Sequence, residues 1–365
     1  MSTILLISPE PWDGHFVSKH HYACELSRRG HRVVFYGPPS DTAGMRLVPV
    51  SNAQGDLLIL HAPRVAPGLR FMPVSLRRRL EAAWLAKLEK ILECPVDVVW
   101  NFENSRFFDM SFAGDRLKIY QQVDLNQDFH PKIAAATSDM SIALSLPIEE
   151  RLKYDAANLI RITHGYVERS PVDKKVNDID AKFAKRSVNA VLVGNLDITY
   201  LDVKLLAQLV SEHPEVGFHF VGRYSDGSRL HNATSSAPNV VFWGQQPSEN
   251  LPAFLRRADV LLVVYLAEQY PEQLANPHKI MEYLASGRCV LATRTLDYEA
   301  QPDLIEMAAD REDFARRFAI ITSQPAEWNS EARVTARQAF ARGNTYERQI
   351  DRIAQALGQR GSLIS

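Results

Sequence analysis

Residues 276–287 combine groups that could bind a phosphorylated ligand. Asn276 and Pro277 are residue types that begin helices, and Lys279 would lie in the first helical turn. A helix N-terminus attracts a diphosphate, and the lysine would add positive charge there. Glu282, one turn later on the same face, could accept hydrogen bonds from ribose hydroxyls. An amphipathic helix with solvated Lys279 and Glu282 is an equally good interpretation of the spacing.

A second candidate group is the carboxylate of Asp124, which follows an apolar segment at 117–120. If that segment is a parallel strand, Asp124 lies at the carboxyl edge of a sheet, where such folds bind ligands. A carboxylate there could accept the proton of a substrate hydroxyl if burial and its neighbours raised its pKa. The alternative is a structural role in which Asp124 anchors its loop.

The loop after the first apolar segment contains Gly14 and His15, just before a helix expected at 16–30. Gly14 would let the backbone approach a sugar or a phosphate, and His15 could donate a hydrogen bond near the helix start. A solvated histidine is the alternative for His15. We expect Lys19 and His20 on the helix surface, without a catalytic role.

The composition is that of an ordinary globular protein with about two domains, since the chain has 365 residues, 46% of them hydrophobic and 23% charged. The net charge of -1 argues against a nucleic-acid-binding surface. The longest apolar run, 260–266, is far shorter than the roughly 18 residues of a membrane span. The three cysteines are far apart and lack metal-ligand spacing, which favours a reducing cytoplasm.

Apolar segments rich in β-branched residues alternate with helical patterns, which predicts parallel sheets covered by helices. The first strands are expected at 3–8, 32–36, 56–60, 97–101, 117–120, 141–144 and 159–163. A charged stretch at 168–187 is interpreted as a linker. A second group of strands is expected at 190–193, 217–221, 239–243, 259–265 and 289–293, with helices at 201–212, 250–257, 278–286, 329–341 and 345–357.

Other signatures of nucleotide or metal chemistry are missing from the sequence. No strand is followed by Gly-x-Gly-x-x-Gly, no P-loop is present, and no His/Cys pattern has metal-ligand spacing. Asp178 and Asp180 have an Asp-x-Asp spacing, but they follow no strand, so a metal site there is rejected. We therefore expect no metal ion and no bound cofactor.

The segment Asn-Pro-x-Lys-x-x-Glu-Tyr-Leu-Ala-x-Gly at 276–287 resembles the donor-binding segment of GT-B glycosyltransferases, in the large group 1 (family 4-like) family with a Glu-x7-Glu signature. The resemblance extends over nearly the whole chain and is strongest at 190–293. It implies an α/β fold with two Rossmann-like, doubly wound parallel-sheet domains that face a central cleft. It also implies transfer of a sugar from a nucleoside-diphosphate sugar, which acts as co-substrate, to an acceptor hydroxyl.

Carried over to this sequence, the resemblance assigns Glu282 to the second glutamate of the signature, which holds the ribose. Leu274 stands at the position of the first glutamate, so Glu272 or Gln273 would have to reach the donor sugar. The family's Arg/Lys pair after the first strand of the second domain is also missing. The expected donor-binding residues are therefore Lys279, Glu282, Arg223, Asn276, Pro277, Gly194, Asn195, Gly244, Gln245 and Tyr265.

The lysine at position 279 and the lone aspartate at position 124 are similar to the xanthan glucuronosyltransferase branch of this fold, which favours Asp124 as the general base. The resemblance further implies domains at 1–170 and 188–340, a linker at 171–187, and a last helix at 341–365 that returns to the first domain. A nucleotide-sugar epimerase or hydrolase, or an inactive nucleotide-sugar-binding subunit, are the alternative functions.

Residues 75–92 predict a basic amphipathic helix, which could rest on anionic lipid. The alternative is an ordinary packed helix whose basic face is exposed to solvent. Because many GT-B enzymes of polysaccharide assembly use acceptors carried on lipids, the resemblance implies a glycan or lipid-linked acceptor. It also implies a cytoplasmic protein with peripheral contact to the inner face of the membrane.

Overall fold

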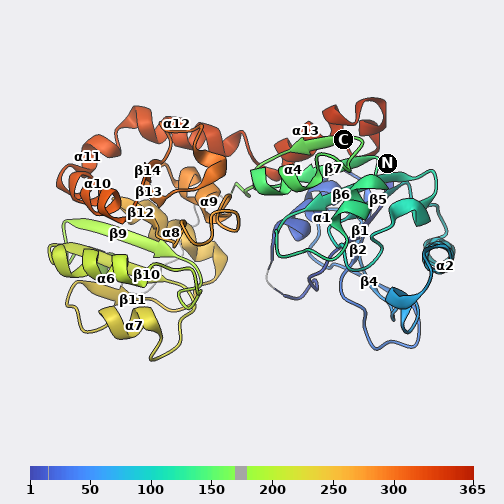
Figure 1. Ribbon diagram of the computed structural model, residues 1–365, viewed down its shortest axis with the longest axis horizontal. Helices are drawn as coiled ribbons and strands as arrows, with labels where there is room; N and C mark the ends of the chain where they lie inside the picture. The colour runs from blue at the N-terminus through green and yellow to red at the C-terminus, as the bar shows by residue number, and fades with distance from the viewer. Residues whose placement is uncertain (15, 169–178) are drawn as a thin grey trace. The chain divides into compact units, whose positions relative to one another are not determined.

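The computed structural model describes residues 1–14, 16–168 and 179–365. The chain divides into two compact units: Met1–Gly165 with Tyr346–Ser365, and Tyr166–Thr345. Each unit contains a largely parallel sheet with helices on its faces (Figure 1). Residues 171–178 of the predicted linker lie outside the described residues. Within 179–187, where the sequence suggested only a linker, helix α5 (Ile179–Phe183) is formed.

The sheet of the first unit has the order β3-β4-β2-β1-β5-β6-β7-β8, in which only β3 and β4 pair antiparallel. The order changes direction between β1 and β5, and the carboxyl edge at such a point is where folds of this kind bind ligands. The strands are β1 Thr3–Ile7, β2 Arg32–Tyr36, β3 Arg46–Pro49, β4 Leu57–His61, β5 Val98–Asn101, β6 Leu117–Gln122, β7 Met140–Ala143 and β8 Leu159–Arg161.

Successive residues of the central strands feed two cores, because side chains alternate across a sheet. Leu5 and Ile7 of β1 pack on one face, whereas Ile4 and Leu6 pack on the other. Helix α2 (Val74–Leu92) covers the first of these faces, and helices α1 (Ser18–Arg28) and α13 (Tyr346–Ala356) cover the second. The remaining elements are α3 Pro131–Ala136, α4 Leu146–Leu152, η1 Leu69–Phe71, η2 Met110–Ala113 and η5 Gly358–Leu363.

Helix α13, red in Figure 1, belongs to the first unit although 180 residues of the second unit precede it. It packs against α1, and its Ile350 and Ile353 are fully buried. The residues just before α13 contact the segment where the chain leaves the first unit. The backbone N–H of Tyr166 donates to the carbonyl of Asn344 at 3.1 Å, and Tyr166 forms a parallel β-bridge with Thr345. The chain thus leaves and re-enters the first unit at neighbouring residues.

The sheet of the second unit is parallel throughout, with the order β11-β10-β9-β12-β13-β14. Its direction changes between β9 and β12. The strands are β9 Val188–Val193, β10 Val216–Val221, β11 Val240–Phe242, β12 Val260–Val263, β13 Cys289–Thr293 and β14 Glu306–Ala308. The helical elements are α6 Val203–Glu212, α7 Arg229–Thr234, α8 Leu251–Arg257, α9 Lys279–Ser286, α10 Arg311–Ser323, α11 Pro325–Trp328, α12 Glu331–Arg342, η3 Ser248–Asn250 and η4 Leu296–Tyr298.

The predicted α/β fold class is confirmed, and every strand expected from the sequence is present. Strands β3 and β14 were not expected, nor were several short helices and the 13-residue helix α10. Among the described residues, no helix is both long and apolar enough to span a membrane.

Candidate active site

Three glycines stand where neighbouring strands of the second sheet end. Gly194, Gly222 and Gly244 follow β9, β10 and β11, and all three have positive φ. Gly194 donates its N–H to the carbonyl of Val221, and Gly222 donates to the carbonyl of Gly244, both at 2.9 Å. A Cβ on Gly222 would lie 1.8 Å from the carbonyl oxygen of Gly194. Only glycine allows these turns to approach so closely.

Lys279 reaches this row of glycines from helix α9. Its ammonium nitrogen donates to the carbonyl oxygen of Val193 at 2.6 Å and lies 4.9 Å from the ring centre of Tyr265. A Cβ on Gly194 would lie 2.9 Å from the same nitrogen. Lys279 is 7% exposed, so the interpretation as a solvated surface lysine is wrong. Lys279, Gly194 and Tyr265 thus meet where the strand order changes direction, between β9 and β12.

Burial lowers the pKa of Lys279 to about 7, and the nearby Glu282 carboxylate opposes this change. The cause is desolvation, which disfavours the charged ammonium. Tyr283, on the same helix, accepts a hydrogen bond from the N–H of Val193 at 2.8 Å through its hydroxyl. Two side chains of α9 therefore fix the end of β9, and one of them carries a charge that an anion would stabilise.

The start of α9 differs from the prediction. The helix begins at Lys279, and His278 occupies the N-cap position instead of Asn276. The N–H of Ile280 donates to the carbonyl of Pro277 at 3.1 Å, so the tightened first turn reaches back to the proline. Pro277 lacks an N–H and cannot donate in this turn. Asn276 and Pro277 are both partly exposed just before the helix.

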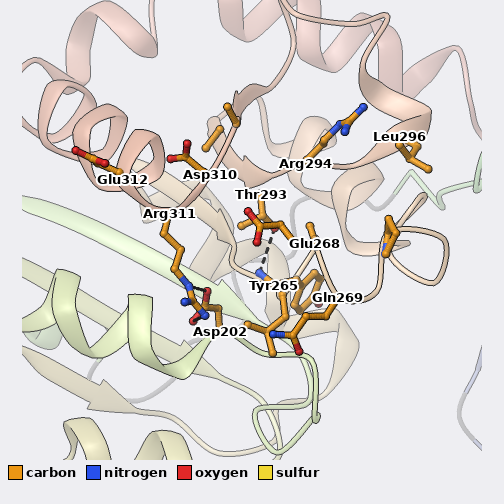
Figure 2. Close-up of a pocket in the computed structure, with 15 residues that line it drawn as sticks. Asp202, Tyr265, Glu268, Gln269, Thr293, Arg294, Leu296, Asp310, Arg311 and Glu312 are labelled. Atoms are coloured by element: carbon orange, nitrogen blue, oxygen red, sulfur yellow. Dashed lines mark hydrogen bonds and ion pairs between the residues drawn. The ribbon is translucent and has the colours of Figure 1, made fainter.

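Tyr265 also lines a cavity of about 700 Å³ at the carboxyl ends of β12, β13 and β14. Figure 2 shows Tyr265 beside Glu268 and Gln269 of the following loop. The backbone N–H of Tyr265 donates to the Thr293 hydroxyl at 3.1 Å. Asp202 and Arg311 form an ion pair at 2.5 Å across the cavity wall. The cavity has the size of a small-molecule site. Its remaining lining residues are Leu266, Ala267, Pro271, Arg294, Leu296, Ala308, Ala309, Asp310 and Glu312.

Glu282 is partly exposed and lines a different cavity, of about 240 Å³. This second cavity is also lined by Ser248, the first residue of η3, and by Leu251, the first residue of α8. Glu282 follows Lys279 by three residues on α9, but only Glu282 lines this second cavity, whereas the Lys279 ammonium is buried against the end of β9.

The other predicted donor residues lie near the glycines. Arg223 is exposed directly after Gly222, and Gln245 is exposed directly after Gly244. The side-chain oxygen of Asn195 accepts a hydrogen bond from the N–H of Asp197 at 3.1 Å, which closes the turn after β9. Leu274 is part of the hydrophobic core, whereas Glu272 and Gln273 are exposed.

In the first unit, Asp124 follows β6 at the carboxyl edge, and solvent reaches it. Its backbone carbonyl accepts hydrogen bonds from Gln122 Nε2 at 3.1 Å and from the N–H of Gln127 at 3.2 Å. The loop is therefore anchored through the backbone of Asp124. Desolvation by surrounding atoms raises the pKa of the Asp124 carboxyl, Lys19 lowers it and Glu10 raises it. Together these effects raise the pKa of the Asp124 carboxyl above its ordinary value.

The expected surface position of Lys19 and His20 is wrong. Lys19 is 2% exposed and forms an ion pair with Glu10 at 3.1 Å. His20 is fully buried, with its ring stacked on Phe35, and burial lowers its pKa. Both side chains pack beneath the loop after β1, and the ring Nε2 of His20 lies 3.0 Å from a carbonyl oxygen of that loop. Gly14 is exposed in this loop, and His15 lies outside the described residues.

Metal ligands do not gather at either sheet edge. Among the residues that the structure describes, no three His, Cys, Asp or Glu side chains come close enough to hold a metal ion. The charged groups available at these edges are single lysines, arginines and carboxylates.

Comparison with known proteins agrees with this architecture. Residues 188–323 match the family of group 1 glycosyl transferases. No curated protein sequence matches the chain. A UDP-forming α,α-trehalose-phosphate synthase from Burkholderia vietnamiensis has a similar structure, with a TM-score of 0.70 and 13% identity over 100% of this chain and 98% of that one.

Two further solved structures have the same fold. Sucrose-phosphate synthase from Thermosynechococcus elongatus gives a TM-score of 0.68 and 14% identity over 98% of this chain and 99% of its own. The lipopolysaccharide outer core galactosyltransferase WaaB gives 0.67 and 13% over 97% and 99%. The chain therefore has the GT-B fold, and its residues 188–323 are similar to the group 1 glycosyl transferases.

Proposed function

We propose that the protein transfers a glycosyl group from a nucleoside-diphosphate sugar to an acceptor hydroxyl. The observation that carries this proposal is the buried ammonium of Lys279 beside Gly194, at the point where the strand order of the second sheet changes direction. This position combines a positive charge with backbone that a ligand can approach closely. The match of residues 188–323 to the group 1 glycosyltransferases supports the same function.

The second unit would bind the donor. Lys279, the start of α9 and the exposed Arg223 would neutralise the diphosphate, whose negative charge grows as the sugar leaves. Glu282 would accept hydrogen bonds from the ribose, and the backbone at Gly244 and Gln245 would meet the base. The 700 Å³ cavity beyond Tyr265 has room for the sugar. Asn276, Pro277 and Asn195 would shape the turns around the diphosphate.

The first unit would bind the acceptor, with Asp124 as general base. Its carboxylate would take the proton of the acceptor hydroxyl as the acceptor oxygen bonds to the anomeric carbon. The bond from that carbon to the diphosphate breaks with its electron pair, so the nucleoside diphosphate leaves as an anion. A raised pKa of Asp124 favours this role, since a stronger base accepts the proton more readily. Gly14 and His15 would contact the acceptor from the first loop.

The proposal is tested with UDP and GDP in a calorimeter, followed by nucleoside-diphosphate release from UDP- and GDP-sugars with a panel of glycoside acceptors. We expect one nucleotide to bind and one sugar to be transferred. Lys279→Ala and Glu282→Ala should each lower turnover by at least about tenfold. Lys204→Met, a change at an exposed lysine of α6, is the control. Unchanged turnover in both site variants would contradict the assignments.

We also propose that transfer needs no metal ion or bound cofactor. The support is chemical, because Lys279, Arg223 and the helix N-terminus can offset the charge that a divalent cation would otherwise balance. A chelator such as EDTA should leave the rate of transfer unchanged. A rate that falls with EDTA and returns with magnesium or manganese would contradict this part of the proposal.

We further propose that the acceptor is a glycan or lipid-linked sugar in polysaccharide or glycoconjugate assembly, used by a cytoplasmic protein at the inner face of the membrane. Phe71, Val74 and Leu76 are exposed at the start of α2, and Arg78 and Arg79 beside them are exposed too. Apolar side chains flanked by arginines suit an anionic lipid surface. Nucleic acid is not an expected partner.

The proposed membrane contact extends beyond the predicted helix at 75–92 to Phe71 and Val74, and it excludes Arg77. Arg77 is buried and stacks on Phe108 at 3.9 Å, so it cannot contribute to the basic face. The contact is tested by co-sedimentation with vesicles that contain phosphatidylglycerol. Phe71→Ser with Leu76→Ser should abolish binding, while Ile320→Ser, at an exposed position of α10, should leave it intact.

A further inference from the structure

The cavity beyond Tyr265 contains an arginine that a carboxylate from another element holds in place. Arg311 is the first residue of α10, and its Nε and Nη2 donate to the Asp202 carboxylate at 2.5 and 3.2 Å. The Asp202 side chain is 3% exposed, and it also caps α6 by accepting a hydrogen bond from the N–H of Leu205 at 3.2 Å. A guanidinium bound through two nitrogens is fixed in direction as well as position. Arg311 therefore has a defined orientation in the cavity wall (Figure 2).

One nitrogen of this guanidinium remains for a ligand. Within the described part of the chain, Nη1 of Arg311 has no hydrogen-bond partner, and half of the side chain is exposed. Glu268 lines the same cavity from the loop after β12, and its carboxylate accepts no hydrogen bond from any described residue. The hydrogen bond to Asp202 raises the pKa of Arg311, and the charge of Glu268 adds a smaller rise. A fixed donor and a carboxylate acceptor therefore line one cavity, close enough for their charges to interact.

The cavity offers no excess of positive charge to a sugar. Both arginines in its lining already form ion pairs, Arg311 with Asp202 and Arg294 with Glu299 at 2.5 Å. Four lining residues supply carboxylates, namely Asp202, Glu268, Asp310 and Glu312. A sugar carboxylate placed here would meet like charges. A sugar hydroxyl could instead accept a hydrogen bond from Arg311 and donate one to Glu268.

The cavity begins where the diphosphate is expected. Tyr265 lines it, and the ring centre of the same tyrosine is 4.9 Å from the Lys279 nitrogen. The backbone also ties Asp202 to this place, since its N–H donates to the carbonyl of Val264 at 3.2 Å. A sugar attached to a diphosphate at Lys279 would therefore reach the guanidinium and the carboxylate that line the cavity.

We propose that Arg311, held by Asp202, and Glu268 determine which sugar the protein transfers, and that this sugar is uncharged. The inference rests on the function proposed above and names the residues that recognise its donor sugar. Arg311 donates from Nη1 to a hydroxyl oxygen of the sugar, and Glu268 accepts a hydrogen bond from a hydroxyl. Leu274 cannot make such a contact, because it is buried in the hydrophobic core. A uronate sugar, which carries a carboxylate, is rejected.

Calorimetry tests this assignment without depending on turnover. UDP, UDP-glucose and UDP-glucuronate are titrated into the protein, or GDP, GDP-mannose and GDP-mannuronate if GDP is the nucleotide that binds. We expect the neutral nucleotide sugar to bind at least about tenfold more tightly than the uronate, because like charges repel in the cavity. High salt should narrow this difference, since solvent reaches the cavity and screens the charges.

Three variants separate the contributions of the side chains. Arg311→Gln should weaken binding of the neutral nucleotide sugar by about five- to tenfold and leave the affinity for the nucleoside diphosphate unchanged, because only sugar contacts are lost. Asp202→Asn should improve uronate binding by roughly tenfold, because Arg311 then lacks its counter-charge. Asparagine is also a good N-cap, so α6 stays capped. Glu268→Gln should improve uronate binding as well, by a smaller factor. Glu212→Gln, at the exposed end of α6, is the control.

Each variant is first checked for folding by its thermal melting temperature. If Arg311→Gln does not fold, Asp202→Asn and Glu268→Gln decide, because a gain in uronate affinity cannot result from unfolding. Equal affinities for the neutral and the uronate nucleotide sugar in the unaltered protein would overturn the proposal. An unchanged ratio of these affinities in the variants that fold would overturn it too.

Turnover separates this inference from the proposed function. If the nucleotide sugars bind with the expected preference but no acceptor is glycosylated, the transfer function fails and the sugar assignment stands. If a uronosyl group is transferred as fast as a neutral glycosyl group, the function stands and the inference fails. If no nucleotide sugar binds, both are wrong.

Discussion

Each unit of the protein buries one lysine at the carboxyl edge of its sheet, but the two lysines have different partners. Lys19 faces the carboxylate of Glu10 at 3.1 Å. Lys279 faces a backbone carbonyl and a tyrosine ring, and within the described part of the chain no carboxylate forms an ion pair with it. A buried lysine that has a carboxylate beside it is already compensated, whereas Lys279 still lacks a full counter-charge.

This difference in partners gives the two sites different charge balances. In the second unit the buried Lys279 has no carboxylate in an ion pair with it among the described residues, and desolvation lowers its pKa to about 7. An anionic ligand would supply the missing negative charge. The first unit keeps a neutralised pair, which does not attract an anion of its own. The comparison thus supports our proposal that the second unit binds the diphosphate and the first unit supplies the proton chemistry.

The largest effect is expected for Lys279→Met. Affinity for the nucleoside diphosphate should fall by about 10- to 150-fold, because charge-assisted hydrogen bonds are worth roughly 1.5 to 3 kcal/mol. The free protein should become more stable at pH 7, by about 1 to 3 kcal/mol, because the variant removes a poorly compensated buried ammonium. Calorimetry and urea unfolding measure the two changes. A loss of affinity together with a loss of stability would contradict the view that Lys279 is poorly compensated in the free protein.

The pH dependence should distinguish the two lysines. Above pH 7 the free protein must add a proton to Lys279 before binding a diphosphate, so affinity should fall by up to about tenfold per pH unit. The stability advantage of Lys279→Met should be absent above pH 10.5, grow as the pH falls from 10.5 to 7, and stay constant below pH 7, because only between these two values does the unaltered chain hold fewer protons folded than unfolded. Binding that is flat from pH 7 to 9 would contradict this account.

Gly194→Ala should have an intermediate effect. The new Cβ would lie 2.9 Å from the Lys279 nitrogen, and the backbone would keep a φ of +141° that favours glycine. We expect a loss of about 1 to 3 kcal/mol in unfolding free energy and a roughly tenfold weaker nucleotide affinity. Gly227→Ala, also at positive φ but with open space around its Cβ, is the control that isolates the displacement of Lys279.

The smallest effect is expected at Tyr265. Tyr265→Leu removes the ring near the ammonium and should weaken nucleotide binding by about two- to fivefold, as expected for a cation–π contact of about 0.5 to 1 kcal/mol. Tyr265→Phe keeps the ring and should bind almost normally. Equal losses in the two variants would show that the hydroxyl, not the ring, is what the site uses.

The fold could be predicted from the sequence because most strands are continuous apolar runs, as in buried parallel sheets. β3 and β14 were missed for a physical reason. β3 (Arg46–Pro49) is a short antiparallel edge strand with exposed and half-buried residues, and β14 (Glu306–Ala308) has only three residues. Short edge strands lack the length over which a hydrophobic pattern can be recognised.

The site was predicted only in part. Lys279 and Gly194 were both predicted as donor-binding residues without any expectation that they would touch, and the burial of Lys19 was not foreseen. A usable signal existed in α1, where Tyr22, Ala23 and Leu26 form a buried stripe that reaches Lys19 one turn earlier. The 700 Å³ cavity could not be foreseen, because it depends on how three loops pack after their strands.

The return of residues 346–365 to the first unit has a consequence for synthesis. Tyr346, Ile350, Ile353 and Ile364 belong to the same core as strands β1 and β2. On the ribosome, the amino-terminal unit therefore stays incomplete until the last helix has been translated, while the contiguous middle of the chain can fold earlier. Removing residues 346–365 would expose one face of the core of the first unit. A truncation there should therefore destabilise the first unit, although it removes none of that unit's strands.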